Sequence, residues 1–276
     1  MTRLSLSQLN YLESHRLADD ELPARILEKL GCSNEVELSP SKLINELIQS
    51  EVFRNHDPYG EAAENISIRT DRGVVASVAL SLMPHAIVET GTSTGLASTI
   101  FIYPLIKKNN GYLFSIDLPH HPGWTEIKST NISQSGALVP PSWRERHINI
   151  IEDVKLALPR IMPKLKAQIF IHDSLHTITH MLFEYIVARA FMPPKSLLVS
   201  DDILWNNAFI SFCEMTSSTF YVSGSNPNFG FAIMDMAEDD LGVYGSRELI
   251  DYLRELEGMK TQVPINNANQ VMPQVF

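Results

Sequence analysis

The chain has 276 residues, of which 44% are apolar, and a formal net charge of −10. This length is enough for one full α/β core with an appendage. The acidic balance, without a basic stripe, argues against a general binder of nucleic-acid backbones. Cys32 and Cys213 predict neither a disulfide framework nor a metal site. No apolar run reaches the length of a signal-peptide core or a membrane span, so we expect a cytoplasmic protein without a membrane contact.

The first 70 residues are polar overall, and their apolar residues recur at helical spacing, as do Leu43, Ile44, Leu47 and Ile48. We expect residues 1–70 to form a helical cap or an oligomerisation element that carries no chemistry, within a homo-oligomer. Residues 71–83 then predict a helix with one apolar face that leads into a strand at Ala86.

From Ala86 onward, short apolar runs alternate with segments of helical spacing, which is typical of a parallel sheet covered by helices on both faces. The predicted strands cover residues 86–88, 111–117, 147–151, 167–173 and 196–202. The sequence therefore predicts an α/β domain over residues 71–245. A C-terminal helix and a loose tail are expected over residues 246–276.

A long segment, residues 118–144, carries several prolines and glycines between two predicted strands. A loop of this length inside a compact domain is usually a lid or a binding loop. His120, His121 and Trp124 are candidates for substrate contact there, and they are equally well explained as ordinary surface residues.

The most informative stretch is AIVETGTSTG at residues 86–95, in which an apolar run ends in an acid before a glycine turn and a helix start. Such a turn lets the backbone approach a ligand closely. The spacing of Glu89, Gly91, Ser93 and Gly95 resembles the first motif of the Rossmann-like S-adenosylmethionine (SAM) methyltransferases, Asp/Glu-x-Gly-x-Gly-x-Gly, with serine in place of the middle glycine. The resemblance implies a doubly wound, mostly parallel sheet and a SAM site at these four residues. The late runs 219–222 and 229–234 resemble the antiparallel pair that closes the sheet of that family.

The same letters also fit two other folds. Gly-x-Ser-x-Gly is the nucleophile elbow of α/β-hydrolases. That fold needs a late triad histidine, and the chain has no histidine after His180. A dinucleotide-binding fold is disfavoured because the glycines follow Gly-x-x-x-Gly and not Gly-x-Gly-x-x-Gly.

Two further acids have places in the resemblance. Asp117 ends the second predicted strand, 22 residues after Gly95, where these enzymes bind the ribose hydroxyls of SAM. Asp153 stands where the family reaches the adenine amino group, although Glu152 replaces the glycine that precedes that position. Each aspartate is alternatively a helix cap.

The acids at the ends of the fourth and fifth predicted strands resemble those of the metal-dependent O-methyltransferases of the catechol and macrolide-sugar types. In those enzymes an aspartate after the fourth strand and an Asp-Asp or Asp-Asn pair after the fifth hold one magnesium ion. The resemblance assigns Mg²⁺ to Asp173, Asp201 and Asp202, and all-oxygen ligands suit this ion. His176, three residues after Asp173, stands where those enzymes carry a base.

These features predict a SAM-dependent, Mg²⁺-assisted O-methyltransferase that acts on a hydroxyl of a small metabolite, with His176 as general base. One alternative is a metal-independent enzyme that methylates nitrogen or a carboxylate, with the aspartates acting as helix caps. A second alternative is a SAM-binding module without catalysis. A third is a zinc site formed by His172, His176 and His180, the last of which is otherwise a helix-face residue satisfied by a neighbour.

Overall fold

The computed structural model describes residues 4–32, 35–57, 60–119 and 135–235. The candidate lid residues His120, His121 and Trp124 lie outside the described residues, as does the C-terminal stretch 246–276. None of the helices in the described ranges is long enough and apolar enough to cross a membrane.

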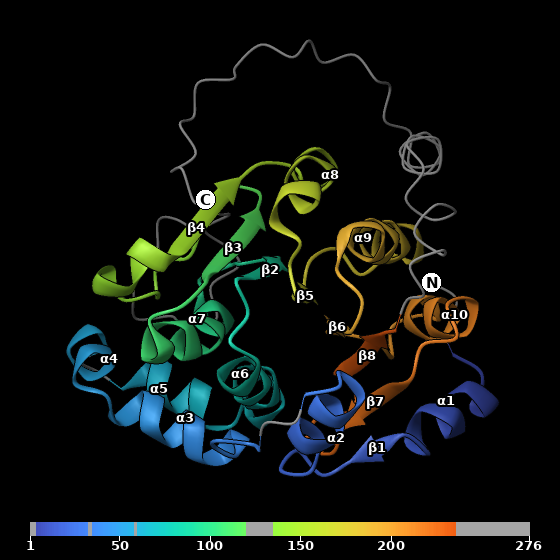
Figure 1. Cartoon of the computed structure of the whole chain (residues 1–276), viewed down its shortest axis with the longest axis horizontal. Coiled ribbons are helices and arrows are strands. Elements are labelled where there is room, and N and C mark those ends of the chain that lie inside the picture. Colours follow the sequence, from blue (N-terminus) through green and yellow to red (C-terminus); the bar gives the residue numbers. More distant parts are fainter. Residues whose placement is uncertain (1–3, 33–34, 58–59, 120–134, 236–276) are drawn as a thin grey trace.

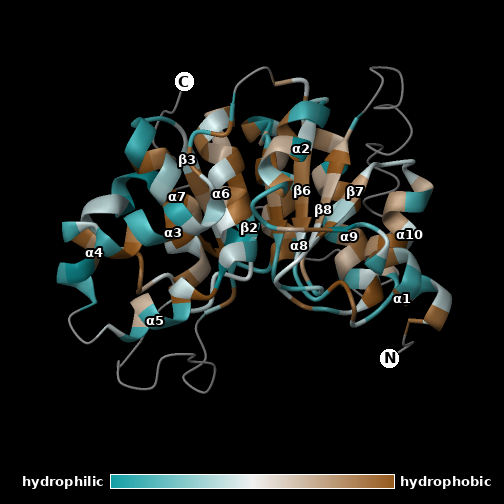
Figure 2. Cartoon of the chain, turned by 90° about the horizontal axis from the view of Figure 1, so that it is seen from below, coloured by the Kyte–Doolittle hydropathy of each residue, from teal (hydrophilic) through white to brown (hydrophobic). Residues whose placement is uncertain are grey.

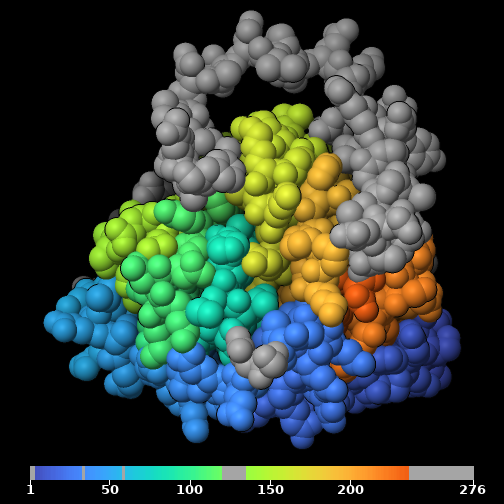
Figure 3. Space-filling model, in the orientation of Figure 1, coloured from blue at the N-terminus to red at the C-terminus, as the bar shows by residue number. Residues whose placement is uncertain are grey.

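The N-terminal region contains five helices and one short strand. They are α1 (Leu6–Glu13), β1 (Arg16–Leu17), α2 (Leu22–Lys29), α3 (Pro40–Gln49), α4 (Glu51–His56) and α5 (Glu61–Ser67). These elements lie along one side of the molecule (blue in Figures 1 and 3). The strand β1 was not predicted, because two residues carry no period that could be recognised.

The rest of the described chain alternates helices and strands. The helices are α6 (Thr70–Leu82), α7 (Leu96–Lys108), α8 (Val154–Leu165), α9 (Ile178–Phe191), α10 (Ala208–Met215) and the 3₁₀ helix η1 (Pro141–Arg146). The strands are β2 (Ala86–Thr90), β3 (Tyr112–Asp117), β4 (His147–Ile151), β5 (Ile169–His172), β6 (Ser196–Ser200), β7 (Phe220–Ser223) and β8 (Gly230–Met234). Each predicted strand is present, within about two residues of its expected bounds.

All eight described strands form one sheet in the order β1-β7-β8-β6-β5-β2-β3-β4. Only β8 runs antiparallel to its neighbours, β6 and β7; the other pairs are parallel. The predicted α/β doubly wound sheet with an antiparallel closing strand is therefore confirmed. The order reverses at β2, which lies between β3 and β5, and ligands of open α/β sheets bind at the carboxyl ends of the strands at such a point.

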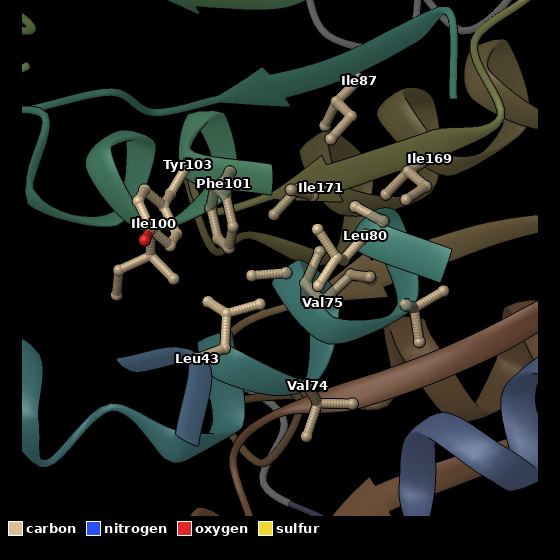
Figure 4. Packing of buried hydrophobic residues seen from close by; sticks show 14 of the residues in the cluster. Leu43, Val74, Val75, Leu80, Ile87, Ile100, Phe101, Tyr103, Ile169 and Ile171 are labelled. Atoms are coloured by element: carbon tan, nitrogen blue, oxygen red, sulfur yellow. The ribbon is translucent and has the colours of Figure 1, made fainter. Parts of the chain in front are cut away.

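The sheet separates two apolar cores, and Figure 1 shows α6 and α7 on one side with α8 and α9 on the other. Successive side chains of the central strands point to opposite faces of the sheet, so each strand contributes to both cores. Ile87 of β2 packs on the α6–α7 side, and Val88 packs on the α8–α9 side. In β5, Ile169 and Ile171 face the first core, as Figure 4 shows, and Phe170 faces the second. In Figure 2 the central strands are correspondingly hydrophobic (brown).

The helix α6 fixes the position of the site. It is buried on nearly all sides, because α3 and the sheet-covering helix α7 both pack on it. A connection of three residues, 83–85, joins α6 to β2, so the helix and the strand run in opposite directions. The first turn of α6, which carries Asp71 and Arg72, therefore lies beside the carboxyl ends of the strands.

Candidate active site

The turn between β2 and α7 is built around two glycines. Gly91 has φ 83°, and a Cβ there would lie 1.7 Å from the carbonyl oxygen of Asp173, so the backbone after β5 fills the space of a side chain. Gly95 has φ 88° and precedes α7, and a Cβ there would lie 2.7 Å from Cα of Gly136. The motif glycines therefore let the turn pack tightly against two other loops.

The turn and the acid at the end of β3 hold each other. The backbone N–H of Ser93 donates to Oδ2 of Asp117 at 2.6 Å, and the N–H of Leu118 donates to Oδ1 at 2.8 Å. Asp153 lies across the same cavity and caps α8, because its Oδ1 accepts from the N–H of Lys155 at 2.9 Å. The position of Asp153 is therefore compatible with both expectations, contact with the adenine amino group and capping of a helix.

A cavity of about 410 Å³ brings these predicted residues together. Gly91, Ser93, Asp117 and Asp153 line it, together with Asp173 and His180. Its volume lies in the range of small-molecule sites, roughly 300–1,000 Å³. The residues fit SAM by their chemistry: carboxylates accept from ribose and amino groups, and the backbone of Gly91 and Ser93 borders the same cavity.

Glu89 and Gly95 do not line this cavity. Glu89 is buried, and its Oε1 accepts from the hydroxyls of Ser98 and Ser115, so it links β2 to α7 and β3. Burial raises the pKa of Glu89 to about 7, against the opposing effect of these two hydrogen bonds. The predicted contact of Glu89 with the cofactor stays a prediction.

The acids after β5 and β6 gather around a cation of the chain itself. The guanidinium of Arg72, 5% exposed, lies between them: Nη2 is 3.2 Å from Oδ2 of Asp173 and 2.5 Å from Oδ2 of Asp201. Nη1 donates to Asp71 at 2.8 Å. Burial lowers the pKa of Arg72, but the charges of Asp173, Asp201 and Asp71 outweigh it and raise the pKa above its ordinary value.

This geometry bears on the predicted magnesium site. A hard cation needs several carboxylate oxygens that converge on one point at about 2.0–2.6 Å. Here one nitrogen of Arg72 stands at the point shared by Asp173 and Asp201, and Asp202 turns toward His176. Within the described residues no group of three or more His, Cys, Asp or Glu side chains is placed to hold a metal. With Arg72 in this position, the three aspartates do not fit a divalent cation.

His176 lies beside this cluster and pairs with Asp202. Its Nδ1 is 3.4 Å from Oδ2 of Asp202, whereas its Nε2 is buried without a hydrogen-bond partner in the described part of the chain. The ring lies 5.4 Å from that of Trp205, whose side chain is half exposed. Burial, and next the charge of His172, lower the pKa of His176 to about 4, so the ring is neutral at neutral pH. An imidazole held at Nδ1 and free at Nε2 can accept a proton.

A second buried network lies beneath the cavity. Glu184 of α9 is fully buried and accepts from Nδ1 of His172 at 2.6 Å and from Nε2 of His180 at 2.8 Å. The hydroxyls of Thr90 and Ser174 donate to it as well, each at 2.6 Å. Burial alone would raise the pKa of Glu184, but His172 and His180 outweigh it and lower the pKa.

This network bears on the two histidines as possible zinc ligands. A carboxylate only accepts, so the protons of both rings point at Glu184. Glu184 therefore orients His172 and His180, and within the described ranges no three or more His, Cys, Asp or Glu side chains are grouped to hold a metal ion. The expectation that His180 is satisfied by a neighbour is confirmed.

Comparisons with known proteins agree with this arrangement. Residues 88–203 match the family model described as a methyltransferase domain. A solved structure from Staphylococcus aureus, provisionally assigned as a caffeoyl-CoA O-methyltransferase, is 13% identical with a TM-score of 0.51, over 70% of this chain and 98% of that one. The O-methyltransferase TomG from Streptomyces achromogenes, solved with SAM, is 12% identical over 82% and 99% of the two chains, with a TM-score of 0.47.

At 13% identity the likeness to the S. aureus structure shows the fold alone. No curated protein matches the sequence. The matched family domain contains the glycine turn, Asp117 and Asp173, and the strand order around it is that of a doubly wound sheet with one antiparallel closing strand. We therefore identify residues 88–203 as a methyltransferase domain within this doubly wound sheet.

Proposed function

We propose that the protein transfers the methyl group of SAM to a hydroxyl oxygen of a small metabolite, with His176 as the general base. The observation that carries the proposal is the pair His176–Asp202, which leaves Nε2 of His176 without a partner among the described residues, directly after the cavity-lining residues 173–175. A hydroxyl is the acceptor that needs such a base, because its proton must leave as the oxygen gains the methyl group. The S. aureus neighbour is also described as an enzyme that methylates oxygen.

The roles of the other residues follow from their positions. SAM, when bound, supplies a methyl group on a positively charged sulfur. In this proposal Asp117 accepts from the ribose hydroxyls and Asp153 accepts from the adenine amino group, and both residues line the 410 Å³ cavity. Gly91 and Ser93 shape the wall between them.

The proton has a defined destination. A bond from carbon to sulfur is exchanged for a bond from carbon to the acceptor oxygen, and the hydroxyl proton passes to Nε2 of His176. Asp202, 3.4 Å from Nδ1, holds the ring in the tautomer that leaves Nε2 free. The half-exposed indole of Trp205 beside this ring offers a flat apolar wall for a phenolic or sugar ring. Magnesium assistance stays a prediction from the sequence.

The experiment is a methyl-transfer assay with isotopically labelled SAM and a panel of phenols, sugars, amines and carboxylic acids. Methyl ethers identified by mass spectrometry and NMR are the expected products. Transfer to nitrogen or to a carboxylate would favour the alternative, a metal-independent methyltransferase that acts on those groups. SAM binding without transfer to any acceptor would favour a module without catalysis.

A further inference from the structure

One nitrogen of the chain occupies the point at which the strand-end carboxylates meet. Nη2 of Arg72 contacts Oδ2 of both Asp173 and Asp201, although these residues lie 101 and 129 positions away in sequence. We infer that the Arg72 guanidinium takes the place of a divalent cation at this acid cluster, so that the enzyme needs no metal ion. Only the catalytic consequence of this inference rests on the proposed function.

The surroundings of Arg72 hold it in this place from the other side. Its Nη1 donates to Asp71, and Oδ2 of Asp71 also accepts from Nδ2 of Asn226 at 2.8 Å. The guanidinium lies 5.0 Å above the ring of Phe229, a favourable cation–π distance. Asp71 is only 2% exposed. A metal ion that displaced Arg72 would therefore leave a buried carboxylate without its cation, which is strongly unfavourable.

The contacts of the strand-end acids are consistent with a replacement of the metal ion by Arg72. Asp173 and Asp201 each have one oxygen on the guanidinium, and Asp202 faces His176. A metal in the same place would bring its positive charge to within a bond length of the same two oxygens. The fixed positive charge is thus supplied by α6, a helix that precedes the first motif in the sequence.

The position of Arg72 suits the reaction. Arg72 and Asp173 line a smaller cavity of about 40 Å³ that shares Gly91, Ser93 and Asp173 with the large one. Arg69, whose buried Nε has no hydrogen-bond partner among the described residues, lines it too. A fixed cation at the wall of the smaller cavity can stabilise negative charge that develops on an acceptor oxygen, without having to be recruited from solution.

The test measures binding of Mn²⁺, a paramagnetic probe for oxygen-ligand sites, by electron paramagnetic resonance. The wild type, Arg72→Met and Arg72→Lys are compared after exhaustive chelation. We expect no stoichiometric Mn²⁺ site in the wild type or in Arg72→Lys, which keeps a cation. Arg72→Met vacates the point between Asp173 and Asp201, so it should bind one Mn²⁺ at least roughly tenfold more tightly than the wild type. Asp201→Asn added to Arg72→Met should abolish this gain.

Folding of the variants is followed by circular dichroism and thermal unfolding. Mn²⁺ should raise the Tm of Arg72→Met and leave that of the wild type unchanged. Should Arg72→Met not fold, the wild type and Arg72→Lys decide the matter. A stoichiometric Mn²⁺ site in the wild type that is lost in Asp201→Asn would overturn the inference, as would a folded Arg72→Met that gains no site. Neither readout involves methyl transfer, so failure of the proposed function would be seen separately.

Discussion

The turn after β2 offers a sharp test of how the sequence builds the cofactor site, through the variant Gly91→Ala. A left-handed backbone at a residue with a Cβ costs about 1–2 kcal/mol. The new Cβ would also lie 1.7 Å from the carbonyl oxygen of Asp173, a backbone atom that cannot rotate away. Forced overpacking of this kind adds about 1–3 kcal/mol. We therefore expect Gly91→Ala to lower the free energy of unfolding by roughly 2–5 kcal/mol.

Gly60→Ala is the matched control. Gly60 also has a positive φ, 73°, but nothing lies within 4 Å of its hypothetical Cβ. It should therefore lose only the left-handed penalty, about 1–2 kcal/mol. Urea unfolding gives both stabilities, and calorimetry gives the affinity for S-adenosylhomocysteine (SAH). Because Gly91 lines the cavity and Gly60 does not, only Gly91→Ala should weaken SAH binding, by tenfold or more, which is about 1.4 kcal/mol. Equal stabilities and equal affinities in the two variants would refute the reasoning.

Three further outcomes are expected. His176→Gln should lower kcat by about 10²–10⁴-fold with little change in SAH affinity, and turnover within a few-fold of wild type would reduce His176 to a packing residue. Burial, and next the charge of Arg144, lower the pKa of His147 to about 4. Because the unfolded chain binds this proton first, the free energy of unfolding should fall by up to about 3 kcal/mol as the pH falls from 6.5 toward 4. Urea unfolding at about pH 7.5 and about pH 5 should show a smaller loss in His147→Gln. Glu184→Gln puts an amide donor among the four groups that donate to this side chain. Its free energy of unfolding, measured in urea, should fall by about 3 kcal/mol or more. A loss under about 1 kcal/mol would contradict the stabilising role of these hydrogen bonds.

Much of the fold and the cavity wall could be predicted from local patterns. Buried parallel strands appear as short apolar runs, so the five strands from β2 to β6 are visible in the sequence. Gly91, Ser93, Asp117 and Asp153 follow strand ends, and all carboxyl ends of parallel strands meet at one edge. Their convergence on a single cavity therefore follows from topology, without knowledge of the packing.

Arg72 and Glu184 could not be placed in this way. Arg72 stands at the start of a helix, where a charged residue usually faces solvent. Its inward position depends on α6 being enclosed by α3 and α7 and on strand ends more than a hundred residues later. Glu184 is a single acid in the apolar run MLFEYIV, which signals a buried partner but does not name it. The magnesium prediction grouped Asp173 and Asp201 with Asp202, and no pattern in the sequence indicated that Arg72 lies between the first two.

Titration calorimetry of the purified protein with SAM and SAH, for the wild type and Asp117→Ala, tests the central claim most directly. The account predicts one site per chain for each ligand in the wild type. In Asp117→Ala the affinity should fall by about tenfold to a hundredfold, since charge-assisted hydrogen bonds contribute about 1.5–3 kcal/mol. A wild-type protein that is folded and binds neither SAM nor SAH would contradict the account.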